Sequence, residues 1–348
     1  MKKIYLVVFS WFIFVLSTAF GQNGLKSGAY FLLPDAQNKV SLNQYRDYKI
    51  IPEKSYKITE KTLYTTDQKT RVALLDTAKN TVTLHWIHSI KKRRLVIPFD
   101  IKPKCLLLND ENLFIGGELG KEMLIQYHIP SKKWFRLKIP TKVLSSRKGI
   151  DDLVINDTTL IAIDNMVFPK YVLFYPLKST DSLAFSAFVE LKSDEPYEHI
   201  YRGRITNDYI ILHSGSFSGY SGAYDHIKVY DLKDLNKNFS LSFSGNQVND
   251  IAVAGNKLLI ANKKKGLGIF EINATYLEPT YIYDECEDTY TPDRNNYFFG
   301  DKGEMEVKYE EYSGKILKMT VLVNTSKVIL TLENEKGEII QEIVETDF

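Results

Sequence analysis

The stretch LLLNDENLFIGG (residues 106–117) recurs in the same form three more times, as LVINDTTLIAID (153–164), RITNDYIILHSG (204–215) and IAVAGNKLLIAN (251–262). Each stretch is a short apolar segment, a turn that carries Asn, Asp or Gly, and a second apolar segment. This is the pattern of two antiparallel strands joined by a tight turn. Aligning on Leu113, Leu160, Ile211 and Leu258 gives steps of 47, 51 and 47 residues. A period of this length indicates a repeat architecture.

Each unit continues into a third strand with alternating apolar residues, and an aromatic stands third from its end, at Tyr127, Tyr175, Tyr230 and Phe270. A fourth strand follows in at least three units: WFRLKI (134–139), LAFSAFVEL (183–191) and FSLSF (239–243). Four short strands in about 48 residues are typical of a blade of a β-propeller. Stacking such sheets around an axis buries faces that a lone sheet would expose.

The repeats resemble those of the divergent β-propellers that include the YVTN and NHL types. The segment VALLDTAKNTVTL (72–84) is similar to the YVTN phrase, and the resemblance covers roughly residues 60–275. It implies an all-β propeller fold. No repeat ends in Trp-Asp, and the double glycine of kelch repeats occurs once, at Gly116-Gly117. The resemblance therefore implies no particular activity.

The number of blades follows from division. The chain after the first 21 residues has 327 residues, and about 48 residues per blade give six or seven blades. The clearest blades are predicted at 101–149, 150–199, 200–247 and 248–283, within a single domain at 22–348. We expect strands from both ends to close the ring, in one shared blade; alternatively, the segment from about Asp284 is a small β appendage.

The N-terminus predicts export. Lys2 and Lys3 precede an apolar stretch over 4–20, and Ala19-Phe20-Gly21 fits a cleavage site. The stretch is shorter than the roughly 20 apolar residues of a membrane span, which leaves an anchor as the second interpretation. No cysteine lies near the site for lipid attachment. A secreted or periplasmic chain from about Gln22, with no transmembrane segment, is therefore expected.

Charge and cysteines exclude several classes of function. The 45 Lys and Arg residues nearly balance the 43 Asp and Glu residues, which argues against a nucleic-acid partner. Cys105 and Cys286 are the only cysteines. They either pair in the oxidising compartment or remain two buried thiols. Two cysteines cannot form a four-thiolate zinc site, and the six histidines show no HExxH spacing.

Polar residues recur just before the innermost strand of each repeat. The aligned pairs are Lys104-Cys105, Asp151-Asp152, Arg202-Gly203 and Asn249-Asp250. In propellers, this end of the innermost strand and the loop between the second and third strands open on one face, around the central channel. Lys104, Asp152, Arg202 and Asp250 are therefore predicted to bind a ligand there. The acids either coordinate calcium or cap turns.

The most unusual loop is HSGSFSGYSGAYDH (213–226), which combines Gly and Ser with aromatics. That composition is typical of binding loops, and it predicts contacts from His213, Phe217, Tyr220 and Tyr224. The alternative is a long flexible connection, because Gly and Ser also make flexible links.

We expect a non-catalytic, monomeric module that binds a protein, peptide or glycan through one face, because no set of titratable groups converges in the sequence. No cofactor is expected, with calcium as the possible exception. The alternative is a propeller enzyme, a lactonase-like hydrolase or a lyase, that uses Asp152, Asp250, Lys104 and Arg202 at the channel mouth.

Overall fold

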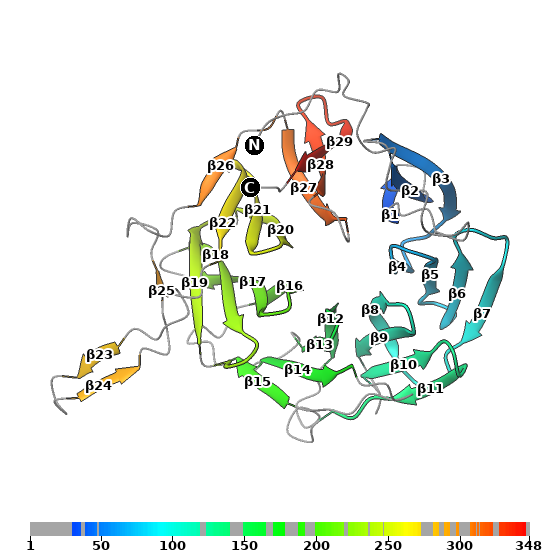
Figure 1. Ribbon diagram of the computed structural model, residues 1–348, viewed down its shortest axis with the longest axis horizontal. Helices are drawn as coiled ribbons and strands as arrows, with labels where there is room; N and C mark the ends of the chain where they lie inside the picture. The colour runs from blue at the N-terminus through cyan, green and yellow to red at the C-terminus, as the bar shows by residue number, and fades with distance from the viewer. Residues whose placement is uncertain are drawn as a thin grey trace, which may run out of the picture.

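The computed structural model describes residues 30–35, 39–46, 49–118, 123–139, 149–164, 170–177, 187–191, 199–218, 222–235, 237–245, 247–272, 281–284, 289–292, 297–298, 307–310, 312, 314–322 and 327–345. Across these residues, seven antiparallel sheets follow one another around a central opening (Figure 1). We number the sheets as blades 1 to 7 in chain order. The all-β propeller expected from the repeats is confirmed.

The first four blades are built from consecutive strands. Blade 1 is β1 (Tyr30–Asp35), β2 (Lys39–Arg46) and β3 (Lys49–Lys57); blade 2 is β4 (Thr62–Thr66), β5 (Arg71–Asp76), β6 (Thr81–Trp86) and β7 (Lys92–Val96); blade 3 is β8 (Lys102–Leu108), β9 (Asn112–Glu118), β10 (Leu124–His128) and β11 (Lys133–Arg136); blade 4 is β12 (Ile150–Ile155), β13 (Thr159–Asp164), β14 (Lys170–Pro176) and β15 (Ala187–Leu191).

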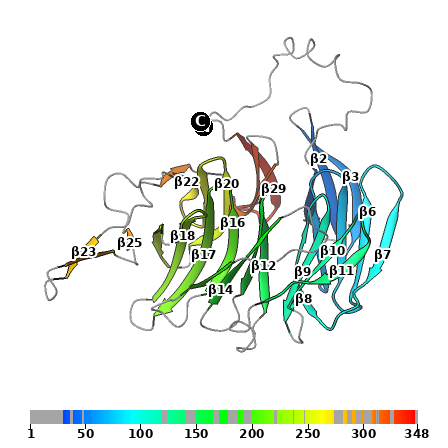
Figure 2. The same ribbon diagram turned by 60° about the horizontal axis from the view of Figure 1, so that its bottom comes forward.

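The last three blades complete the ring. Blade 5 is β16 (His199–Ile205), β17 (Tyr209–Ser218), β18 (Gly222–Asp231) and β19 (Asn238–Ser244); blade 6 is β20 (Val248–Ala254), β21 (Lys257–Asn262), β22 (Gly266–Glu271) and β26 (Lys308–Glu310); blade 7 is β27 (Gly314–Val321), β28 (Lys327–Asn334) and β29 (Ile339–Glu345). Figure 2 shows the strands running from one face of the ring to the other.

The repeated polar residues close the turn between the first and second strands. The side-chain oxygens of Asn109, Asn156 and Thr206 each accept two backbone N–H bonds from the next residues. In blade 6, Gly255 takes this turn with a φ of +63°, a left-handed conformation that glycine adopts without a steric penalty. The turn chemistry explains why the four sequence stretches look alike.

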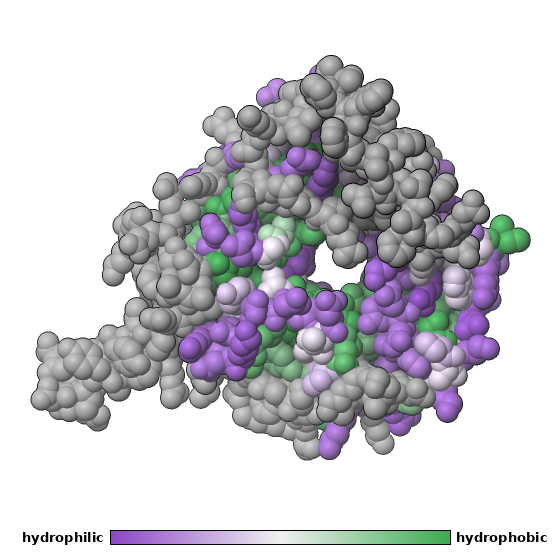
Figure 3. All heavy atoms as spheres, viewed as in Figure 1, coloured by the Kyte–Doolittle hydropathy of each residue, from purple (hydrophilic) through white to green (hydrophobic). Residues whose placement is uncertain are grey.

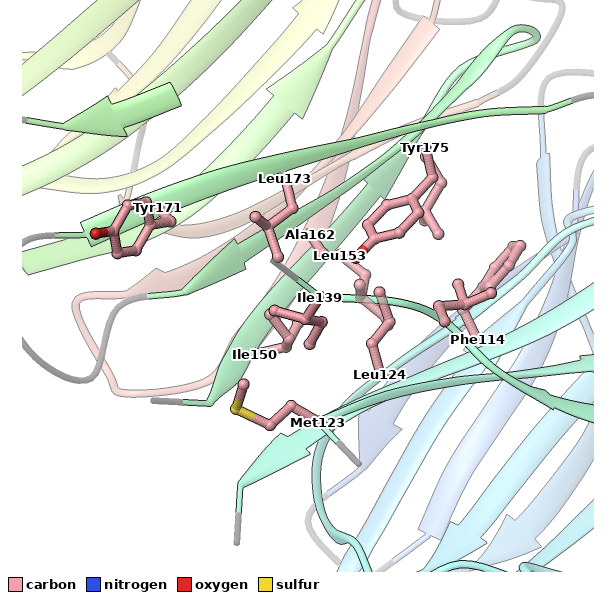
Figure 4. Packing of buried hydrophobic residues seen from close by; sticks show 12 residues of the cluster. Phe114, Met123, Leu124, Ile139, Ile150, Leu153, Ala162, Tyr171, Leu173 and Tyr175 are labelled. Atoms are coloured by element: carbon pink, nitrogen blue, oxygen red, sulfur yellow. The ribbon is translucent and has the colours of Figure 1, made fainter. Parts of the chain in front are cut away.

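The core lies between the blades. Figure 4 shows one cluster, in which Phe114 and Leu124 of blade 3 pack against Leu153 and Leu173 of blade 4. Tyr175, one of the recurring aromatics, is fully buried there, and its hydroxyl donates to the Lys138 carbonyl at 2.9 Å. The aromatic of each third strand packs toward the preceding blade, and Tyr127, Tyr230 and Phe270 do the same. These positions are therefore structural.

A β-bulge recurs on the innermost strand of blades 3 to 7. The residue just after the bulge is Cys105, Asp152, Arg202, Asp250 or Lys318, in blade order. Blade 5 corrects the sequence alignment by one residue: Ile210, not Ile211, pairs with Tyr230 as Leu160 pairs with Tyr175. The pair equivalent to Asp151-Asp152 is therefore Tyr201-Arg202, not Arg202-Gly203. A slip of one residue transfers a side chain to the other face of a strand, so the alignment missed Tyr201.

The first and last described blades lie next to each other in the ring. Within the described residues, blades 1 and 7 contain three strands each, all from one end of the chain. Phe31 and Leu33 of blade 1 pack against Leu322 and Ile329 of blade 7. Among the described residues, side-chain packing between two separate sheets closes the ring, whereas one blade shared by both ends was expected.

An insertion interrupts blade 6. Its outer strand β26 comes after the predicted boundary at residue 283. Between β22 and β26, the strands β23 (Tyr281–Asp284) and β24 (Thr289–Pro292) form a hairpin that projects from the ring (Figures 1 and 2), and β25 (Tyr297–Phe298) pairs with β19. The appendage expected from Asp284 onward is thus limited to this insertion, since residues 314–345 form blade 7. Within the described residues, no helix has the length and apolarity to cross a membrane.

Candidate functional site at the channel mouth

The innermost strands surround a channel with a volume of about 500 Å³. Figure 3 shows its opening at the centre of the ring. Blades 1 and 2 contribute uncharged residues to its wall: Phe31, Leu32, Tyr64, Thr65, Thr66 and Gln68. Two charged residues, Arg204 and Lys318, line it from blades 5 and 7. The wall of the channel is therefore cationic on one side only.

One face carries both the start of the innermost strands and the loops between second and third strands. In blade 5, Ile200 pairs with Ser214, and in blade 6 Val248 pairs with Asn262. We call this end of the channel the channel mouth, defined by Lys104, Asp152, Arg202 and Asp250. The predicted arrangement of the two kinds of segment on one face is confirmed by these registers.

Lys104 forms ion pairs between blades 3 and 4. Its Nζ lies 2.9 Å from Asp151 Oδ1 and 2.9 Å from Glu118 Oε2. Burial alone lowers the pKa of Lys104, but hydrogen bonds to Glu118 and Asp151 outweigh burial and hold that pKa above its usual value. The ammonium group is thus neutralised by two carboxylates. Cys105 beside it forms no disulfide among the described residues; Cys286 lies outside them, so both alternatives for the two cysteines, a disulfide or two buried thiols, stay open.

Asp152 and Asp250 join the innermost strands of neighbouring blades. Asp152 accepts the backbone N–H of Leu153 and, across the blade boundary, that of Gly203 at 2.9 Å. Burial raises the pKa of Asp152. Asp250 is fully buried and accepts the N–H of Met319, on blade 7, at 2.8 Å. Both acids therefore act as structural hydrogen-bond acceptors, which supports the capping interpretation over calcium coordination.

Three cations surround Asp250. Arg202 Nη1 and Arg204 Nη2 lie 2.8 and 3.0 Å from its Oδ1. Lys318 is the third cation. Burial is the largest cause that lowers the pKa of Lys318, and the charges of Arg202 and Arg204 lower it further. The Asp250 carboxylate acts in the opposite direction but does not outweigh them. Within the described part of the chain, no carboxylate forms an ion pair with Lys318.

His213 and Asp225 form a buried pair inside blade 5. His213 Nε2 lies 3.2 Å from Asp225 Oδ1, and both residues are at most 2% exposed. The other oxygen of Asp225 accepts the backbone N–H of Val248, on blade 6, at 2.7 Å. Among the described residues, no hydrogen-bond partner faces His213 Nδ1. Both side chains are buried, and through Asp225 the pair joins blades 5 and 6.

The predicted loop after His213 is mostly strand. β17 continues to Ser218 and β18 resumes at Gly222, with residues 215–218 paired to 222–225. The loop interpretation was wrong here because Gly and Ser are also compatible with a long twisted hairpin. Tyr224 stacks on His226 at 6.3 Å between ring centroids. The side chain of Phe217 and all of Tyr220 lie outside the described residues.

Tyr201 is the exposed aromatic that the sequence alignment missed. It occupies the bulge beside Arg202 and is 48% exposed. Its ring packs edge-on against His213 at 5.2 Å, and a Cβ placed on Gly215 would lie 2.5 Å from the ring. The glycine therefore creates the space in which Tyr201 rests. Burial and the charge of Asp225 raise the pKa of the Tyr201 hydroxyl.

The four mouth residues have separate partners. Lys104 pairs with Asp151 between blades 3 and 4, whereas Arg202 pairs with Asp250 between blades 5 and 6. Asp152 bonds to backbone between them. In the described part of the chain, no group of three or more His, Cys, Asp or Glu side chains has the arrangement of a metal site. The structure adds Tyr201, Arg204 and Lys318, which sequence alignment did not identify.

Comparison with known proteins supports the fold assignment but identifies no function. The sequence matches no known protein family and no curated protein. The computationally designed Ika8 protein matches at a TM-score of 0.55 and 11% identity, over 92% of this chain and 84% of that one. A functionally unknown protein from Desulfotomaculum acetoxidans matches at 0.54 and 10%, over 92% of this chain and 100% of that one. The fold is a β-propeller.

A third similar structure is BamB from Moraxella catarrhalis, at a TM-score of 0.47 and 11% identity, over 92% of this chain and 82% of that one. Sequence identities of 10–11% support a shared fold and no shared function. The propeller therefore has to be assigned a function from its own mouth residues.

Proposed function

We propose that this propeller is an exported, non-catalytic binding module that acts as a monomer and takes a protein, peptide or glycan ligand at the channel mouth. One observation carries the proposal. At the mouth of blades 4 to 6 the carboxylates are engaged by backbone N–H groups of the next blade, while Tyr201 and Arg202 keep exposed surface beside them. An exposed ring next to a guanidinium group is a common recognition surface.

The same contacts argue against catalysis at these residues. A general acid or base must be free to exchange a proton with a substrate. Asp250 accepts from two backbone N–H groups and two arginines, and Asp152 accepts from two backbone N–H groups. The enzyme alternative requires these two carboxylates and is therefore not the function we propose.

Export and membership of the YVTN/NHL-like group remain parts of this proposal. The basic and apolar N-terminal segment supports the first, and the repeat form with its segment at 72–84 supports the second. Both are consistent with a propeller that displays one binding face outside the cytoplasm.

The test compares binding to arrays of immobilised glycans and peptides. The labelled wild-type protein is compared with Tyr201→Ala, which removes the exposed ring, and with Glu111→Ala as the matched control. Glu111 is exposed in the turn between β8 and β9, at the opposite end of the strands from the mouth. Circular dichroism establishes that both variants fold.

We expect array signals that Tyr201→Ala abolishes and Glu111→Ala leaves unchanged. Signals that survive Tyr201→Ala but disappear with Glu111→Ala would place binding on the other face. An array with no bound member at all would also contradict the proposal.

A further inference from the structure

The charged side chains between blades 5, 6 and 7 indicate which chemical group of a ligand could bind there. We propose that Lys318 and Arg204, with Arg202 nearby on Asp250, bind a carboxylate group of the ligand where the channel wall is cationic. This inference rests on the proposed function, because it names the group by which the ligand at the channel mouth is held.

The charges around the cluster do not cancel. Lys318, Arg204 and Arg202 are three cations, and the carboxylates that interact with them are Asp250 and Asp152. One positive charge therefore remains in a partly desolvated site. A carboxylate carries one negative charge and offers two oxygens, whereas phosphate carries close to two charges at neutral pH. The remaining charge fits the carboxylate.

Asp250 has little capacity left for Lys318. Its Oδ1 accepts from the Ile251 N–H, Arg202 and Arg204, and its Oδ2 accepts from the Met319 N–H. Asp250 already accepts four of the roughly four bonds that a carboxylate can take, and among the described residues it forms ion pairs with the two arginines rather than with Lys318. The ammonium of Lys318 consequently needs an acceptor from water or from a ligand.

Lys318 lies where a ligand can reach it. It lines the 500 Å³ channel together with Arg204, and it is half-buried. The titratable and charged groups around it are Asp250 and the two arginines. Burial and the arginines hold its pKa below the usual value, and a bound anion would reverse part of that effect. An anion is therefore stabilised by Lys318, and it stabilises the charged lysine in return.

The fork of Arg204 is already oriented. Its Nε donates to the Ile251 carbonyl and its Nη1 to the Gly203 carbonyl, while Nη2 contacts Asp250. Fixed donors lose less conformational entropy on binding than mobile ones. Arg204 therefore contributes a fixed charge beside Lys318, and Lys318 provides the donors that remain available.

Isothermal titration calorimetry tests the inference with four organic probes and with inorganic phosphate. Glucuronate and N-acetylglutamate carry the carboxylate on a sugar or on an amino acid, and glucose and N-acetylglutamine are their uncharged counterparts. The ionic strength is kept constant with sodium chloride. We expect the wild-type protein to bind at least one carboxylate and neither uncharged probe, and the better carboxylate distinguishes a sugar from a peptide source.

The variants isolate the lysine. We expect Lys318→Met to weaken carboxylate binding about tenfold or more, as loss of a hydrogen bond to a charged group does, and Lys318→Arg to keep most of it. Lys264→Met is the matched control, since Lys264 is exposed in the β21–β22 turn on the same face, and it should bind as the wild type does.

Equal binding by wild type and Lys318→Met would overturn the assignment, and so would Lys318-dependent binding of inorganic phosphate that exceeds carboxylate binding. Failure of every carboxylate probe, combined with array signals that depend on Tyr201, would overturn this inference and leave the proposed function standing. Loss of both would overturn the two together.

Discussion

Blades 1 and 2 differ from blades 4 to 7 in how their innermost strands meet the channel. β1 and β4 pair with their neighbours without a register shift and give the channel uncharged residues. β12, β16, β20 and β27 each contain a bulge, and each has a charged residue directly after it: Asp152, Arg202, Asp250 and Lys318.

The difference shows what the bulge provides. A bulge redirects the side chains beside it and often lies next to a functional site. Here it directs Asp152 and Asp250 to backbone N–H groups of the next blade. The acids hold the blades together, and the cations stay at the channel. Apolar packing joins neighbouring blades on both halves of the ring, including blades 1 and 7.

The largest expected effect is on the charged half. Asp250→Ala removes the acceptor of two buried backbone N–H groups and leaves three cations without it. Breaking a buried ion pair from one side costs about 3–5 kcal/mol. Urea unfolding should show this loss in the free energy of unfolding.

Asp208→Ala serves as the control, because Asp208 forms an exposed ion pair with Lys233, and its urea midpoint should match the wild type. A midpoint for Asp250→Ala equal to that of the control would show that the buried carboxylate does not hold blades 6 and 7 together.

The boundary between blades 1 and 7, where the uncharged half meets the charged half, should depend on the volume of its apolar side chains. Ile329 is fully buried against Phe31 and Leu33, so Ile329→Ala should cost about 2–5 kcal/mol through lost burial and the cavity left behind. The same unfolding measurement tests it. Ile339 on β29 is 56% exposed, and Ile339→Ala should leave the urea midpoint unchanged; a similar loss from both variants would contradict closure by packing.

A double-mutant cycle tests the packing of the Tyr201 ring against Gly215. Gly215→Ala places a Cβ within 2.5 Å of the tyrosine ring and should cost about 1–3 kcal/mol, as overpacking does. In a Tyr201→Ala background the same substitution should cost much less, because the clash has been removed. Equal costs in both backgrounds would show that the ring does not rest on Gly215.

The smallest expected effect is an increase in thermal stability on replacing Lys318. Burial holds the pKa of Lys318 below its usual value, so the unfolded chain binds this proton more tightly than the folded one, and stability rises with pH between the two pKa values. Lys318→Met should therefore have a higher Tm than the wild type near neutral pH. The difference should shrink as pH rises toward about 10.4, the usual pKa of lysine.

Differential scanning fluorimetry from pH 7 to 10 measures this trend. A Tm difference that stays constant or grows across this range would contradict the pKa shift of Lys318.

The sequence predicted the blades with strong turns and missed the features set by register. The side chains of Asn109 and Asn156 bond to the backbone of their own turns. Because this chemistry is local, it can be recognised in the sequence, and blades 3 to 6 were predicted from it. Tyr201 was missed because the aromatic spacing does not show which of two adjacent residues occupies a bulge; only strand pairing does. Lys318 stands in a strand that was predicted from its apolar residues, and nothing local indicates that β27 faces Asp250 across a blade boundary.

The contact between blades 1 and 7 that closes the ring could not be predicted from the sequence either. β1 and β28 are almost 300 residues apart in sequence, and the packing of Phe31 on Ile329 depends on every blade between them. Composition shows that such residues are buried but not against what.

The most direct test of the account is a crystal structure of the protein with the strongest ligand from the array, at saturating concentration. We expect ligand density at the channel mouth, in contact with Tyr201 and with a carboxylate within hydrogen-bonding distance of Lys318. Density at the outer strands, for example between Tyr56 and Lys92 beside the separate pocket there, with an empty channel mouth, would contradict it.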